Sequence, residues 1–171
     1  NTTEYIDLTK PYYSKDMVDT YRFGEKNYIF AGKYPYPQFA SVYLLFNKEL
    51  FENYKLDEPY ELVKSGKWTL DKFAELVKGK YSDLNGNAEH DIDDQYGMSA
   101  FEIVYNYFYF SAGGRVVSNG KNGFTYEMNT DRSISIMEKL VALIDSEDTY
   151  AATPGDPKIR YKNFTDGHSL F

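Results

Sequence analysis

Residues 41–76 read SVYLLFNKELFENYKLDEPYELVKSGKWTLDKFAEL, a stretch that joins an apolar run to several signals that start helices. Its first seven residues, 41–47, are the most apolar short run of the chain, and their length and aromatic content predict a buried strand. Pro59 suits the first position of a helix, where its missing N–H is not needed. Thr69 is expected to cap the next helix, with Asp71 in the first turn. The stretch therefore predicts a strand followed by short helices.

The later part of the chain mixes helical and strand patterns. Five apolar residues recur at i, i+3, i+4, i+7 and i+11, which places them on one helix face: Phe101, Val104, Tyr105, Phe108 and Ala112. Thr130 or Asp131 is expected to cap a further helix, and residues 95–100 are expected to form a strand. The predicted fold class is α/β, with a small mixed sheet flanked by helices, and α+β is the alternative.

Composition limits the class of partner. The chain has 171 residues, which suggests one domain or one lobe of a larger protein. Its net charge is −7 and it shows no basic patch, so nucleic acid is not expected as a partner. It contains 18 Tyr, and an excess of tyrosine is typical of surfaces that bind sugars or proteins, because the ring packs while the hydroxyl forms hydrogen bonds. It has no cysteine, and no apolar stretch approaches the length of a membrane span.

An acidic stretch, DLNGNAEHDIDDQYG over residues 83–97, has the ligand spacing of a calcium-binding loop. Oxygen-bearing side chains stand at places 1, 3, 5, 7, 9 and 12 of a twelve-residue loop: Asp83, Asn85, Asn87, Glu89, Asp91 and Asp94. Two features depart from the pattern, because place 6 is Ala88 instead of glycine and place 12 is the shorter Asp94. The prediction is a structural Ca²⁺ site, and the alternative is an exposed connection held by side-chain-to-backbone turns.

Several motifs in order resemble one family. Phe46-Asn47-Lys48 followed by Leu50-Phe51, and then Trp68-Thr69, resemble the corresponding segment of bacterial extracellular solute-binding proteins of ABC importers. The resemblance is to the large group that includes the maltose- and oligosaccharide-binding proteins. The acidic stretch, SAGGRVV at 111–117 and NFTDGHSLF at 163–171 extend it, so that it runs from about Tyr28 to the end of the chain.

The resemblance implies a periplasmic-binding-protein-like fold, in which two α/β lobes joined by a hinge close on a solute. This chain would be a fragment, a single lobe over residues 1–171, with residues 1–27 as an arm or a hinge-proximal segment. The implied function is capture of a carbohydrate or similar polar solute for import, followed by docking on a membrane permease. The resemblance also implies a monomer without enzymatic activity, located outside the cell or in the cell envelope and lipid-anchored when full-length.

The same resemblance points to candidate ligand-binding residues just after the predicted strand at 95–100. The candidates are Phe101, Glu102, Tyr105 and Asn106, with Tyr36 and Tyr43 at the mouth of the cleft. An aromatic ring stacks on the apolar face of a sugar, while a carboxylate and an amide bind its hydroxyls. The alternative is that Phe101 and Tyr105 belong to the core, and for Tyr43 packing is favoured over ligand contact.

Two other functions stay open: a carbohydrate-active enzyme domain, and a Ca²⁺-stabilised adhesion or interaction module. The only histidines are His90 and His168, and neither has a Ser/His/Asp set near it in sequence. A pair of glycosidase carboxylates is defined in space, so sequence does not exclude it.

Overall fold

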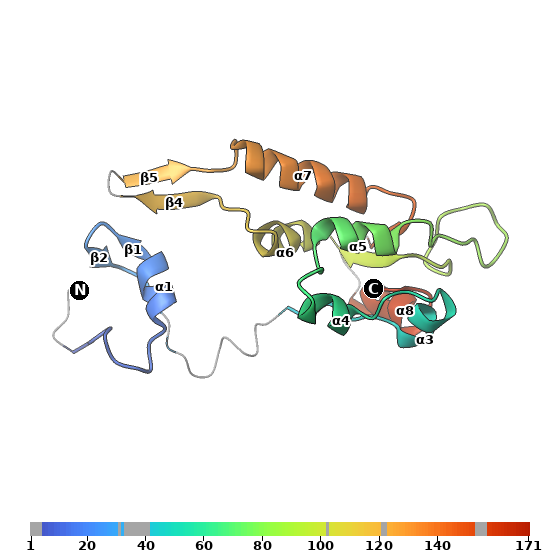
Figure 1. Cartoon of the computed structure of the whole chain (residues 1–171), viewed down its shortest axis with the longest axis horizontal. Coiled ribbons are helices and arrows are strands. Elements are labelled where there is room, and N and C mark those ends of the chain that lie inside the picture. The colour runs from blue at the N-terminus through green and yellow to red at the C-terminus, as the bar shows by residue number, and fades with distance from the viewer. Residues whose placement is uncertain (1–4, 31, 33–41, 102, 121–122, 153–156) are drawn as a thin grey trace. The chain divides into compact units, whose positions relative to one another are not determined.

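The computed structural model describes residues 5–30, 32, 42–101, 103–120, 123–152 and 157–171 (Figure 1). The chain divides into two compact units, which are described separately. The first unit combines Asn1–Tyr43 with Val117–Tyr126, and the second combines Leu44–Val116 with Glu127–Phe171. The chain therefore passes between the units after Tyr43, after Val116 and after Tyr126. The expected single lobe over 1–171, with its arm at 1–27, stays a prediction.

The described part of the first unit contains one short helix and two hairpins. These are α1 (Lys15–Thr20), the antiparallel pair β1 (Arg22–Phe23) and β2 (Lys26–Asn27), and the antiparallel pair β4 (Val117–Gly120) and β5 (Gly123–Tyr126). Asn119 Nδ2 donates to the carbonyl of Arg22 at 2.9 Å, and the rings of Phe23 and Phe124 lie 4.8 Å apart. These contacts connect the two hairpins, although both Phe side chains stay exposed.

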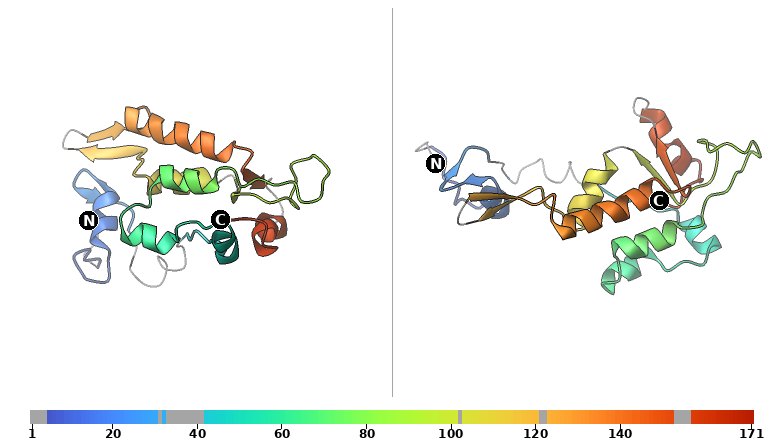
Figure 2. Two further views of the ribbon diagram at one scale, coloured as in Figure 1. Left: turned by 45° about the vertical axis from the view of Figure 1, so that its right-hand side comes forward. Right: turned by 90° about the horizontal axis from the view of Figure 1, so that it is seen from above.

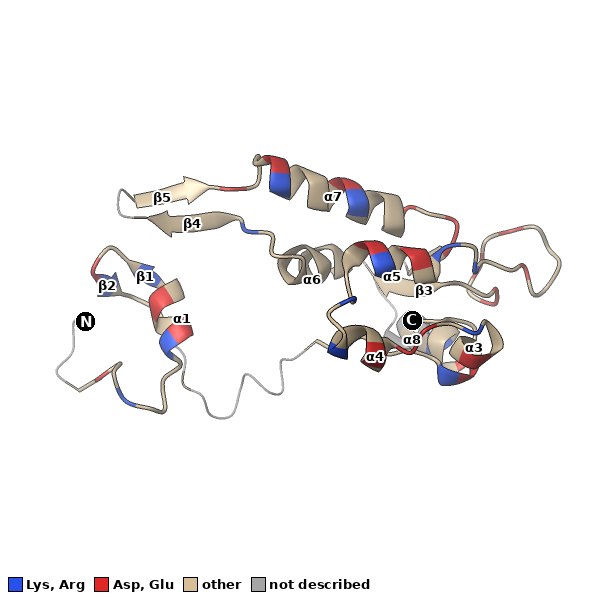
Figure 3. Cartoon of the chain, viewed as in Figure 1, with Lys and Arg blue, Asp and Glu red and all other residues tan. Residues whose placement is uncertain are grey.

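The second unit holds the remaining elements. Its helices are α3 (Lys48–Asn53), α4 (Pro59–Lys64), α5 (Leu70–Val77), α6 (Val104–Ser111), α7 (Asp131–Ile144) and α8 (Pro157–Thr165), and its strands are β3 (Met98–Phe101) and β6 (Thr149–Ala152). Helix α7 contacts both α5 and α6, and the views of Figures 1 and 2 agree on this. Helices α5 and α7 each carry both basic and acidic residues (Figure 3).

The sheet of the second unit is parallel. Strand β3 pairs with β6 in a register that places Met98 opposite Thr149 and Phe101 opposite Ala152. The last residues join the other edge of β3, because Ser99 N–H donates to the carbonyl of Phe171 at 3.0 Å. Parallel strands need a long crossover, and here the chain between β3 and β6 includes α6 and α7. A small mixed α/β fold is therefore confirmed.

Helix starts were predicted well because their signals are local. The side chain of Thr69 accepts from Lys72 N–H at the start of α5, and that of Thr130 accepts from Ser133 N–H at the start of α7. Pro59 is the first residue of α4, as expected.

The core is built where these helices meet the parallel strands. Its largest cluster contains Phe51, Leu62, Phe73, Leu76, Val77, Met98, Ala100, Leu143, Ile144, Leu170 and Phe171. The ring of Phe171 lies 4.6 Å from that of Phe73 and 6.1 Å from that of Trp68. Trp68 is thus a packing residue in the same cluster.

Two sequence-based expectations are wrong. Residues 42–47 form no strand, and four consecutive side chains are exposed there: Val42 (56%), Tyr43 (75%), Leu44 (44%) and Leu45 (58%). An apolar run is expected to be buried, but its composition does not show whether a neighbouring strand is present to pair with it. Of residues 42–47, only Phe46 packs against the core. Phe101 ends strand β3 and does not open α6, which begins at Val104. The inner face of α6 is otherwise as predicted, with Val104, Tyr105 and Phe108 packed on the core.

Candidate functional site

The carboxyl end of the parallel strands is the first candidate site. Phe101 is the last residue of β3 and is partly buried. Helix α6 starts three residues later, at Val104, and Asn106 in its first turn is exposed. In open α/β sheets, ligands bind beyond the carboxyl ends of the strands. Phe101 and Asn106 therefore stand at the end of the sheet where such folds bind ligands.

The side chain of Tyr105 is fixed by packing and by a hydrogen bond. It is partly buried and packs against both hydrophobic clusters of the second unit. Its hydroxyl donates to Asp145 Oδ1 at 3.1 Å. Burial raises the pKa of this hydroxyl, and the hydrogen bond to Asp145 adds to the effect. Tyr105 thus contributes packing whatever else it does, and its ring is fixed in orientation.

The other predicted ligand residues are placed differently. Glu102 and Tyr36 lie outside the residues that the structure describes. Tyr43 lies in the first unit and is 75% exposed.

The second candidate site is the acidic loop. Both carboxylate oxygens of Asp83 accept backbone N–H groups, Oδ1 from Gly86 at 2.6 Å and Oδ2 from Ala88 at 2.9 Å. These two bonds, that from Ala88 first, hold the pKa of Asp83 below its ordinary value. Ala88, at the place where glycine is usual, has φ of +61°. The chain therefore makes the left-handed turn of a calcium loop at place 6, although a side chain is strained there.

Asp91 is the point where the amides of the loop meet. Its Oδ2 accepts from Asn85 Nδ2 at 3.1 Å and from Asn87 Nδ2 at 2.7 Å. Its Oδ1 accepts from Asp93 N–H at 2.8 Å. This hydrogen bond is the largest cause that lowers the pKa of Asp91 below its ordinary value. Four of the predicted ligands, Asp83, Asn85, Asn87 and Asp91, are thus engaged in one hydrogen-bonded loop.

Asp94 turns toward the protein and is fully buried. Its Oδ1 accepts from Leu84 N–H at 3.1 Å, and its Oδ2 accepts from the hydroxyl of Tyr81 at 3.2 Å. Glu89 stays exposed. Among the described residues, no three carboxylate or imidazole side chains gather closely enough to hold a metal ion. The Ca²⁺ site stays a prediction, and Asp94 has a second role as the anchor of the loop.

Sequence reasoning did not find the residues that fix this loop to the sheet. Asn163 is fully buried, and its Nδ2 donates to the carbonyls of Ile92 at 3.0 Å and Asp94 at 2.6 Å. Its Oδ1 accepts from the hydroxyl of Ser99 in β3 at 2.6 Å. Asn163 lies in the NFTDGHSLF motif, but nothing in that motif shows that its partners are about seventy residues away. One amide thus connects α8, the acidic loop and β3.

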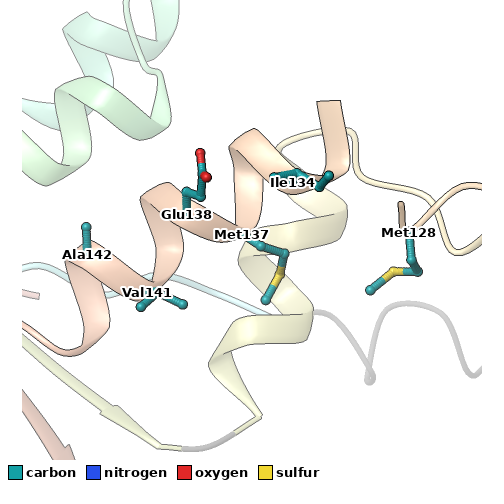
Figure 4. Close-up of a pocket in the computed structure, with 6 residues that line it drawn as sticks. All are labelled: Met128, Ile134, Met137, Glu138, Val141 and Ala142. Atoms are coloured by element: carbon teal, nitrogen blue, oxygen red, sulfur yellow. The ribbon is translucent and has the colours of Figure 1, made fainter. Parts of the chain in front are cut away.

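An apolar hollow of about 480 Å³ lies along α7. It is lined by Met128, Ile134, Met137, Glu138, Val141 and Ala142, and Figure 4 shows the carboxylate of Glu138 turned away from the side chain of Met137. A site for a polar solute needs polar groups that fix its orientation. Among the described residues, Glu138 is the only charged one that lines the hollow, so the hollow does not compete with the end of the sheet as a solute site.

Comparison of the chain with protein-family models, with curated proteins and with solved structures finds no match. In the described part of the chain, no helix is both long enough and apolar enough to cross a membrane.

Proposed function

We propose that this chain is the solute-binding lobe of an ABC importer and that it contacts a carbohydrate or a similar polar solute. The observation that supports the proposal is the parallel sheet whose carboxyl end carries Phe101, with α6 following directly. This is the arrangement in which α/β sheets bind ligands. The motifs that resemble extracellular solute-binding proteins supply the class of solute and the importer.

Three residues of this region have separate proposed roles in solute binding. The ring of Phe101 stacks on the C–H face of a sugar, and the amide of Asn106 binds hydroxyls. Tyr105 is a positioning residue, because its hydroxyl is held by Asp145 and its ring packs on the core. The resemblance adds Glu102 as a carboxylate partner. In the proposed cycle a second lobe closes over the solute, and the closed form docks on a permease.

Ca²⁺ belongs to the proposal as a structural ion of the acidic loop. Two observations support it: the ligand spacing from Asp83 to Asp94, and the left-handed backbone of Ala88 at place 6. The ion would bring together the carboxylates of Asp83 and Asp91, which repel each other without it. Its proposed effect is on stability and not on contact with the solute.

An NMR titration of the chain with maltose and longer oligosaccharides tests the solute proposal. Weak, saturable binding is expected, with amide shifts concentrated at residues 99–106, because one lobe provides half of the contacts. Asn106→Ala should weaken binding several-fold. Asn53→Ala is the matched control, since Asn53 is also an exposed helical asparagine and lies in α3.

Three results would count against the proposal. They are shifts spread evenly over the chain, equal effects of the two asparagine variants, and no shift with any saccharide. New anomeric signals during the titration would show cleavage of the oligosaccharide and would identify a carbohydrate-active enzyme instead.

A further inference from the structure

We propose that Asn85 is a site of spontaneous covalent modification, in which its side-chain amide reacts with the backbone nitrogen of Gly86. The product is a cyclic imide, which water opens to aspartate or to isoaspartate. The reaction needs neither a bound solute nor Ca²⁺. It starts from an Asn-Gly pair, in which the backbone nitrogen is unhindered because glycine has no Cβ.

The nitrogen that attacks is already bound to a carboxylate. Gly86 N–H donates to Oδ1 of Asp83 at 2.6 Å. A carboxylate within hydrogen-bond reach of a nucleophile can take its proton as the new bond forms. Among the described residues, no atom beyond the chain neighbours of Gly86 lies within 4 Å of the place where a Cβ would stand. The nitrogen therefore has a base beside it and open space around it.

The amide that is attacked is held in one orientation. Oδ1 of Asn85 accepts from Asn87 N–H at 3.0 Å, a bond between residues i and i+2 that bends the side chain back along the backbone. The same bond places a donor on the oxygen that gains negative charge when Cγ is attacked. Nδ2 of Asn85, which leaves, donates to Oδ2 of Asp91 at 3.1 Å. An oriented amide beside its nucleophile is the arrangement that accelerates an intramolecular reaction.

The reaction balances with water as its only co-reactant. The bond between the nitrogen of Gly86 and Cγ of Asn85 forms, and the bond between Cγ and Nδ2 breaks. The proton of Gly86 N–H passes to Asp83 and then to the departing ammonia, so that Asp83 is restored. Water then adds to either carbonyl of the imide, and nothing is oxidised or reduced. Either product replaces the amide that donated to Asp91 with a carboxylate that repels it.

A second Asn-Gly pair provides an internal comparison. The pair Asn119–Gly120 lies in β4, where Asn119 is opposite Phe124 in the ladder with β5. Nδ2 of Asn119 donates to the carbonyl of Arg22 at 2.9 Å. Formation of the five-membered imide requires the side chain to fold onto the next peptide, and these contacts oppose that movement. A third pair, Asn122–Gly123, includes a residue outside those that the structure describes.

Peptide mapping by mass spectrometry of the whole chain, incubated with EDTA at constant neutral pH, tests the proposal. In the folded chain, Asn85 should be converted several-fold faster than Asn119, and faster than Asn85 in the chain unfolded by guanidinium chloride. Asp83→Asn should slow conversion at Asn85 several-fold, because it removes the base. Asp93→Asn is the matched control: it also removes one charge from the acidic loop, but the carboxylate of Asp93 binds Lys162 at 2.7 Å, and conversion should proceed as in the wild type.

Three results would overturn the proposal. They are an Asn85 that stays an amide throughout, faster conversion of Asn85 in the unfolded chain than in the folded chain, and equal effects of Asp83→Asn and Asp93→Asn. The comparison of folded and unfolded wild type needs no variant, so it decides the question if Asp83→Asn does not fold.

Discussion

Replacing Asp148 with alanine should destabilise the second unit more than any exposed substitution. The carboxylate of Asp148 is buried, and it accepts three consecutive backbone N–H groups at the end of α5. Oδ2 accepts from Gly79 at 2.8 Å, and Oδ1 accepts from Lys80 at 2.7 Å and from Tyr81 at 2.9 Å. The partners are separated by 67 to 69 residues in sequence, so this one side chain connects the end of α5 to the start of β6.

The magnitude follows from these bonds. A hydrogen bond to a charged group contributes about 1.5–3 kcal/mol, and the loss of one partner leaves the other unsatisfied. Three bonds that share one acceptor group do not add fully, and water can enter part of the space that alanine leaves. We therefore expect Asp148→Ala to lower the free energy of unfolding by about 3–5 kcal/mol, a large fraction of the stability of a typical domain. Asp148→Asn, which keeps one acceptor oxygen, should lose about half as much.

Urea unfolding followed by Trp68 fluorescence measures this change, because Trp68 packs in the core of the same unit. The control is Asp145→Ala, which removes an exposed carboxylate that accepts one hydrogen bond from Tyr105. It should cost about 1 kcal/mol or less. If Asp148→Ala unfolds within about 1 kcal/mol of that control, the three backbone bonds do not stabilise the fold as argued.

Three further predictions concern the loop and α6. Ca²⁺ should raise the melting temperature, Asp83→Ala should abolish that rise, and a melting curve unchanged by either Ca²⁺ or EDTA would exclude the site. The pKa of Asp83 is lowered from 3.8, so its bonds to Gly86 and Ala88 should persist above that pH and be lost as the pH falls through the lowered value. NMR shifts of those two amide protons report it, and a transition of these shifts at or above pH 3.8 would contradict it. Tyr109→Phe should cost about 1–2 kcal/mol in urea unfolding, because the buried Tyr109 hydroxyl donates to the carbonyl of Arg115 at 2.8 Å, whereas the exposed Tyr107→Phe should cost nothing measurable.

The parts of the fold that sequence predicted are those with local causes. Thr69 and Thr130 cap helices within three residues of themselves, so their signals are complete in a short window. The inner face of α6 followed from spacing alone. The position of Phe101 at the end of β3 did not, because spacing does not show where a strand gives way to a helix.

The parts that sequence did not predict depend on distant partners. In the sequence, nothing distinguishes Asp148 and Asn163 from other polar residues, because the groups that they bind are distant along the chain. For the run at 42–46, the apolar composition predicted burial, whereas the side chains of Val42 to Leu45 are exposed. Composition alone does not show whether another segment packs on a run. In the acidic loop, spacing predicted possible ligands, whereas the burial of Asp94 and its bond to Tyr81 arise only from the folded chain.

The hairpin of β4 and β5 belongs to the first unit, although the chain on either side of it belongs to the second. The units are therefore tied together by separate peptide links after Tyr43, Val116 and Tyr126. A cut after Tyr43 would give two fragments that both contribute to the first unit, so noncovalent contacts such as those of Asn119 with Arg22 and of Phe124 with Phe23 would have to hold the fragments together.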